Sequence, residues 1–93
     1  MNELNQIVFE MLSNLRDGDY KDPGEETKKQ VLDYTKNVNQ KLQKGENVNK
    51  DLLKLLEMVY LMDSYSRDYP EESEWIYNFL EEVSDNIFYG IDY

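Results

Sequence analysis

The chain has 93 residues with a formal net charge of −10, and it contains neither histidine nor cysteine. It therefore lacks the commonest general base near neutral pH, and it cannot form disulfides. Its negative charge repels phosphate backbones and anionic lipid, which disfavours direct binding to nucleic acid or to such membranes. The length fits one domain over residues 1–93.

Apolar residues recur at three- to four-residue spacing in four consecutive segments, which predicts four amphipathic helices. The first helix is predicted over residues 3–16, and the turn-forming run from Asp17 to Pro23 ends it. Its apolar stripe consists of Leu4, Ile7, Val8, Met11, Leu12 and Leu15.

The second helix is predicted over residues 24–44, with Asp22 as a candidate cap and Gly45 as the stop. Its apolar stripe is thin, so few of its side chains are available for a core. We therefore expect a peripheral helix that could expose Val31 or Val38 to a partner.

The third helix, predicted over residues 49–68, has the widest apolar face. Such a width implies contact with more than one neighbour, so we expect this helix to be central. The predicted face comprises Val48, Leu52, Leu53, Leu55, Leu56, Met58, Val59, Tyr60, Met62 and Tyr65.

The fourth helix is predicted over residues 71–89, because Pro70 ends the third helix and opens the next. Its predicted inner face comprises Trp75, Ile76, Phe79, Leu80, Val83, Ile87 and Phe88. Four amphipathic helices joined by short connectors predict an all-α fold, an antiparallel four-helix bundle with up-down-up-down topology.

Residue types and spacings for catalysis, metal binding or cofactor binding are missing. Paired carboxylates such as Glu71 and Glu72 point about 100° apart on a helix, so a solvated face explains them better than a catalytic pair. An EF-hand starting at Asp17 would place Lys21 and Lys28 at two ligand positions, so the calcium-loop pattern fails. We expect no catalytic residues, no metal and no cofactor.

Neither a membrane span nor a signal peptide is expected. No run of about 18 apolar residues occurs, and the segment from Met1 to Leu12 lacks a basic region followed by an apolar run. We therefore expect a cytoplasmic protein that does not span a membrane.

Charge and aromatic residues are unevenly distributed along the chain. Residues 47–93 carry eleven acidic and three basic residues, and no basic residue follows Arg67. This pattern predicts either a solubilising outer face or a negative surface that steers a basic protein partner. Four residues in this half, three of them tyrosines of the kind that interfaces favour, are predicted partner-binding residues. They are Tyr77, Tyr89, Ile91 and Tyr93, and the last three could instead fold back onto the bundle.

The pattern resembles the enterocin A immunity family, whose members protect producers of pediocin-like bacteriocins. The resemblance covers most of the chain as spacing and residue type. The segments that carry it are Gln6–Leu12, Tyr20–Pro23, Val31–Leu32, Val38–Leu42, Leu52–Leu53, Val59–Leu61 and Ser73–Ser84.

The resemblance implies a cytoplasmic antiparallel four-helix bundle that engages the bacteriocin-bound mannose phosphotransferase permease and blocks the lethal pore. It places the specificity determinant in the carboxy-terminal half, here residues 47–93, and it assigns no individual binding residue.

An alternative hypothesis from another class is an acidic phage-type inhibitor that mimics nucleic acid and binds a DNA-processing enzyme. Its motivation is the net charge and the run of acidic residues from Asp68 onward.

Overall fold

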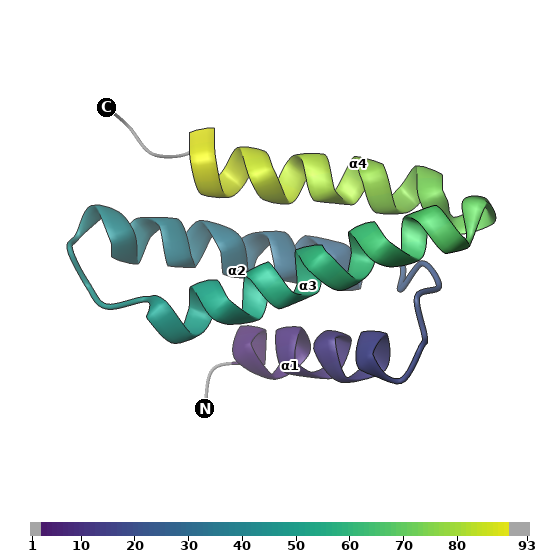
Figure 1. Cartoon of the computed structure of the whole chain (residues 1–93). Coiled ribbons are helices and arrows are strands. Elements are labelled where there is room, and N and C mark those ends of the chain that lie inside the picture. The colour runs from purple at the N-terminus through teal and green to yellow at the C-terminus, as the bar shows by residue number, and fades with distance from the viewer. Residues whose placement is uncertain (1–2, 90–93) are drawn as a thin grey trace.

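The computed structural model describes the backbone of residues 3–89 and the side chains of residues 5–87. Four helices make up the fold, and no strand occurs within the described backbone (Figure 1). They are α1 (Glu3–Arg16), α2 (Glu25–Gln43), α3 (Asn49–Asp68) and α4 (Ser73–Ser84). A 3₁₀ turn, η1 (Pro70–Glu72), precedes α4, and a π-helical turn, η2 (Asp85–Tyr89), follows it. The prediction of an all-α helical bundle is confirmed.

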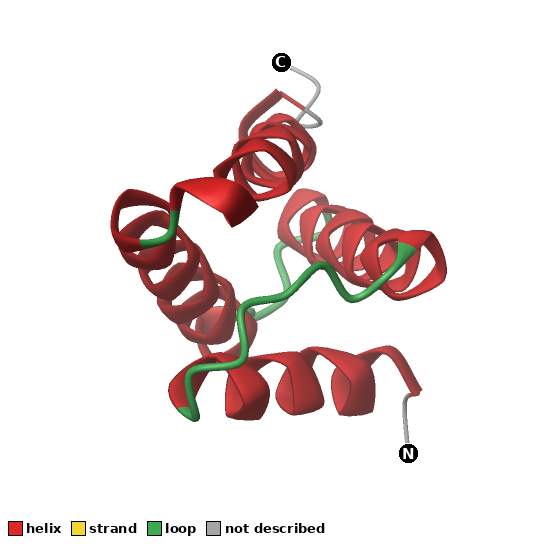
Figure 2. Ribbon diagram, turned by 90° about the vertical axis from the view of Figure 1, so that its right-hand side faces the viewer, coloured by secondary structure: helices red, strands yellow, loops and turns green. Residues whose placement is uncertain are grey.

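Successive helices run in opposite directions, which gives the up-down-up-down order (Figure 1). Helix α1 packs on α2 and α3, whereas α4 packs mainly on α3, and η2 contacts α2. In the view of Figure 2, α1 is seen from its side while α4 is seen nearly end-on, so α1 crosses the bundle steeply. Within the described backbone, no Cα atom of α1 lies within 8 Å of one of α4, so these two helices approach each other only through side chains.

The core takes apolar side chains from all four helices and from the connector before α3. The buried set is Val8, Met11, Leu12, Leu15, Val31, Tyr34, Val38, Val48, Leu55, Met58, Met62, Ile76, Phe79 and Val83. Phe79 is fully buried as predicted, and Trp75 packs partly buried against the core.

Helix α2 lies deeper in the bundle than its thin apolar stripe predicts. Val31 and Val38 are at most 1% exposed, so the expectation that they could face a partner is wrong. Two buried polar residues, Thr35 and Asn39, complete the inner face of α2. The spacing of apolar residues gives no sign that polar residues such as Thr35 and Asn39 are buried, which is why α2 was predicted to be peripheral.

Asn39 connects α2 to the turn that follows α4. Its side-chain amide donates to the backbone carbonyls of Asn86, at 2.8 Å, and Ile87, at 3.3 Å. Its own carbonyl accepts from the Gln43 side chain at 2.8 Å, and the Asn86 amide donates to the Thr35 hydroxyl at 3.1 Å. The carbonyls of the π-helical turn therefore find partners on α2 although the regular α-helical ladder has ended.

Glycines close the first two helices in the same way. Gly18 and Gly45 have φ values of 91° and 76°, a left-handed backbone conformation that residues other than glycine rarely adopt. The amide of the next residue reaches back to the carbonyl five residues earlier, Asp19 to Asn14 at 2.8 Å and Glu46 to Lys41 at 2.9 Å. Both ends are Schellman motifs, and the predicted stop at Gly45 is confirmed.

The start of α2 differs from the prediction. Gly24, not Asp22, occupies the cap position, and no side chain caps the helix. The Asp22 carboxylate instead accepts from the Gly24 amide at 2.9 Å and pairs with Lys28 at 3.1 Å. Asp22 therefore shapes the connector before the helix.

Three tyrosines fasten the α1–α2 connector to the end of α3. The ring of Tyr20 stacks on those of Tyr69 and Tyr65, with centroids 4.1 and 5.3 Å away. The Tyr65 hydroxyl donates to the Leu15 carbonyl in the last turn of α1. These contacts close the end of the bundle at which α1 and α3 both finish.

Tyr34 ties α2 to the first turn of α3. Its hydroxyl donates to the Asp51 carboxylate, and Lys41 lies 3.9 Å from the same carboxylate. Burial, together with the hydrogen bond and the negative charge of Asp51, raises the pKa of Tyr34 well above its usual value.

We predict that Asn39→Ala lowers the free energy of unfolding by about 1–3 kcal/mol, because the carbonyls of Asn86 and Ile87 lose a buried donor. Urea denaturation followed by circular dichroism measures the change. Gln40→Ala, at the exposed neighbouring position, should stay within about 0.5 kcal/mol of the parent. Equal stability of Asn39→Ala and the parent would contradict the role assigned to this amide.

We also predict that Tyr34→Phe destabilises the fold by about 1–2 kcal/mol at neutral pH, because Asp51 loses its hydrogen-bond donor. The folded-state pKa of Tyr34 lies above the unfolded value of about 10. The hydrogen bond therefore stabilises fully below that pH, and its contribution is lost as the pH rises through the folded-state pKa.

Denaturation from pH 8 to pH 12 measures this contribution, and the stability deficit of Tyr34→Phe should shrink toward the alkaline end. Tyr60→Phe is the control, because the Tyr60 side chain is exposed and should show no such trend. A deficit of constant size across the range would contradict the assignment.

Candidate interaction surface

Four large apolar side chains lie exposed on the neighbouring helices α3 and α4. Leu53, Leu56 and Tyr60 of α3 are 66%, 62% and 72% exposed, and Tyr77 of α4 is 52% exposed. The first three were predicted to belong to the buried face of α3, and this prediction is wrong. Leu53 and Tyr60 lie on the side of α3 opposite Met58 and Met62, which fill the core, and Leu56 lies between the two sides.

An apolar groove adjoins these side chains. Its lining comes from α3 on one side and from α4 with η2 on the other, and its volume is about 400 Å³. The lining residues are Leu52, Leu55, Leu56, Val59, Val83, Ser84 and Ile87. We call this groove the α3–α4 groove, and together with Leu53, Tyr60 and Tyr77 it forms the α3–α4 face.

A row of carboxylates follows the outer edge of α4. Glu74, Glu81 and Asp85 are exposed and recur at spacings of seven and four, so they form a stripe on one side of the helix. Tyr77 and Ser84 occupy the adjacent stripe, between the carboxylates and the groove. Among the described side chains, the acidic residues from Asp68 to Asp85 form no ion pair, so their charge is uncompensated.

The ion pairs lie elsewhere on the molecule. The guanidinium of Arg16 makes a two-pronged contact with the Glu57 carboxylate, at 2.7 and 2.5 Å, and joins α1 to α3. Its hydrogen bonds and positive charge lower the pKa of Glu57. Arg67, the last basic residue of the chain, pairs with Asp63 at 2.9 Å.

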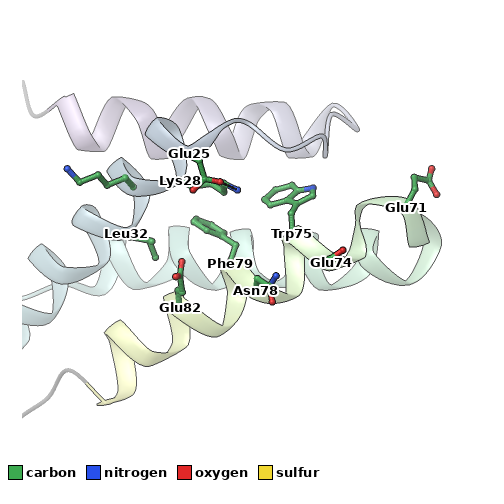
Figure 3. Close-up of a pocket in the computed structure, with 10 residues that line it drawn as sticks. Glu25, Lys28, Leu32, Glu71, Glu74, Trp75, Asn78, Phe79 and Glu82 are labelled. Atoms are coloured by element: carbon green, nitrogen blue, oxygen red, sulfur yellow. Dashed lines mark ion pairs between the residues drawn. The ribbon is translucent and has the colours of Figure 1, made fainter.

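A second groove, of about 520 Å³, lies between α2 and α4 (Figure 3). Trp75 and Phe79 of α4 face Lys28 and Leu32 of α2 across it, and Glu82 lies farther along α4. An aromatic wall with nearby carboxylates is a candidate site for a cationic group.

The Lys28 and Trp75 side chains of this second groove already have partners within the chain. Lys28 pairs with Glu25 at 2.9 Å and with Asp22 at 3.1 Å, and its ammonium lies 5.7 Å from the centroid of the Trp75 ring. The Trp75 indole donates to the Glu72 carboxylate at 2.8 Å.

The two carboxylates raise the pKa of Lys28, with the Glu25 hydrogen bond as the largest cause, so the ammonium stays charged. The contacts of Lys28 and Trp75 fasten the α1–α2 connector and α2 to the start of α4. We therefore assign the second groove a structural role and take the α3–α4 face as the candidate site.

The four predicted partner-binding residues have different outcomes. Tyr77 is exposed on α4, on the same stripe as the groove residue Ser84. The backbone of Tyr89 ends η2, but its side chain lies outside the described part, and Ile91 and Tyr93 lie outside the described residues altogether. Sequence reasoning missed Leu56 and Tyr60 as surface residues. The available signal was the width of the apolar face of α3, which exceeds what one core-facing stripe requires.

Comparison of the chain with family models, with curated proteins and with solved structures finds no match. No helix within residues 3–89 has both the length and the apolar character needed to cross a membrane. The described side chains also include no cluster of three or more acidic residues arranged to hold a metal ion.

We predict that Lys28→Ala shifts the fluorescence of Trp75, the chain's only tryptophan, to longer wavelength because the ring loses the side chain that covers it. The same change should lower the free energy of unfolding by about 0.5–1 kcal/mol. Lys29→Ala is the matched control, because Lys29 lines the same groove but is exposed. Identical emission spectra for both variants would contradict the contact.

Proposed function

We propose that this protein is a bacteriocin immunity protein of the enterocin A type, which acts in the cytoplasm. In this proposal it binds the bacteriocin-bound mannose permease complex from the cytoplasmic side and carries out no catalytic step. The sequence resemblance set out above supports the proposal, as does the all-α bundle, which is the fold that the resemblance implies.

The observation that carries the proposal is the α3–α4 face. Leu56, Tyr60 and Tyr77 are exposed in the carboxy-terminal half, where the resemblance places the specificity determinant. Large apolar and aromatic side chains left in water are costly unless a partner covers them, and tyrosine is common among the anchors of protein interfaces. A surface of this kind favours protein binding over turnover.

The proposal predicts that expressing the chain in a bacteriocin-sensitive strain restores growth under a pediocin-like bacteriocin. Leu56→Asp should abolish protection, because it places a charge in the apolar contact while leaving the core intact. Phe9→Asp is the matched control, since Phe9 is 55% exposed on α1 and lies outside the α3–α4 face. Growth curves of cells with equal protein levels provide the measurement.

Full killing of cells that express the parent chain, across a panel of pediocin-like peptides, would rule out the immunity function. Equal protection by Leu56→Asp and the parent would leave immunity in place and remove the α3–α4 face from it.

The second candidate function is the acidic inhibitor that mimics nucleic acid. The uncompensated carboxylates of Glu74, Glu81 and Asp85 favour it. The two functions differ in the surface that is indispensable: a nucleic-acid mimic requires the carboxylate row and can do without the apolar groove, whereas the immunity protein requires the groove. Inhibition of a DNA-processing enzyme that survives Leu56→Asp but is lost in Glu81→Gln/Asp85→Asn would favour the mimic.

A further inference from the structure

The α3–α4 groove has the shape and lining of a helix-binding groove. Its walls are two antiparallel helices (Figure 1), and Ser84 is the only polar residue among those that line it. The ridges of two packed helices leave a channel in which the side chains of a third helix can lie. An amphipathic helix fills such a channel with apolar anchors three and four residues apart.

The negative charge on the α4 side of the groove favours a partner helix with basic residues on the side that faces α4. Glu81 and Asp85 lie on α4 one stripe beyond Ser84, outside the groove lining, and both are exposed and without an ion pair in the described part. On α3, Asp63 and Arg67 compensate each other at 2.9 Å. The surface beyond Ser84 is therefore negative on the α4 side, so lysine or arginine on the matching flank of a partner helix would be attracted.

A second copy of the chain fits this surface poorly. Each copy carries a formal net charge of −10, so two copies repel each other before their apolar groups meet. The α4 border would also bring uncompensated carboxylates into the contact. A basic partner removes both costs.

We infer that the α3–α4 groove binds an amphipathic helix of the protein partner, with apolar anchors against Leu56, Val59 and Ile87 and basic side chains toward Glu81 and Asp85. The inference rests on the proposed function, because it specifies the chemistry of the segment that the immunity protein would contact.

The test uses a synthetic helical peptide of leucine and lysine, with leucines at three- and four-residue spacing, titrated into the full chain by calorimetry. A peptide with the same leucine stripe and glutamate in place of lysine is the first control. A scrambled leucine–lysine peptide without an apolar stripe is the second. We expect only the amphipathic basic peptide to bind, with an affinity that falls as salt rises.

Variants locate the binding. Leu56→Asp should weaken binding by about tenfold or more, because a charge replaces a central anchor. Glu81→Gln/Asp85→Asn should weaken it by about three- to tenfold and flatten the salt dependence. The controls are Phe9→Asp and Glu26→Gln/Glu46→Gln, which change exposed residues away from the groove and should keep binding close to that of the parent.

Three results would overturn the inference: no binding of the basic amphipathic peptide, equal binding by Leu56→Asp, or equal binding of the glutamate peptide. Analytical ultracentrifugation of the parent chain should show a monomer, and a dimer that Leu56→Asp dissociates would assign the groove to a second copy instead. Failure of growth protection with peptide binding intact counts against the immunity function alone. Growth protection without peptide binding counts against the helix alone.

Discussion

The burial of one apolar stripe from each of four helices is the constraint on which the rest of the structure depends. Val8, Val31, Met58 and Val83, one from each helix, have no exposed surface. The chain has no cysteine and so no disulfide to hold so small a bundle, and apolar burial has to offset the loss of chain entropy. Polar contacts such as Arg16–Glu57 and Tyr34–Asp51 then determine how neighbouring helices are placed.

Helix α3 carries more apolar residues than the core buries. Leu55 and Met62 turn inward, whereas Leu53, Leu56 and Tyr60 remain exposed to water. A helix that had only to fold would gain solubility from polar residues at those three positions. The surplus therefore favours a binding role, and the uncompensated carboxylates on α4 favour a basic partner for it.

The helical class and the order of the bundle follow from the sequence because apolar periodicity and the glycine stops are local signals. Gly45 ends α2 through its own left-handed backbone, which no distant contact has to supply. The burial of α2 could not be predicted from the sequence, because Thr35 and Asn39 are buried through hydrogen bonds to residues about 50 positions away. The exposed side of α3 did not follow either, because periodicity measures how wide a stripe is and not which part of it a neighbour covers.

The π-helical turn connects α2 to the α3–α4 groove. Such a turn accommodates one residue more than an α-helical turn, so the side chains after Asp85 are rotated away from the positions that a regular α-helix would give them. The Asn39 amide holds the carbonyls of this turn, and Ile87, within the same turn, lines the α3–α4 groove. A single amide on α2 thus anchors the turn that supplies Ile87 to a surface to which α2 itself contributes no residue.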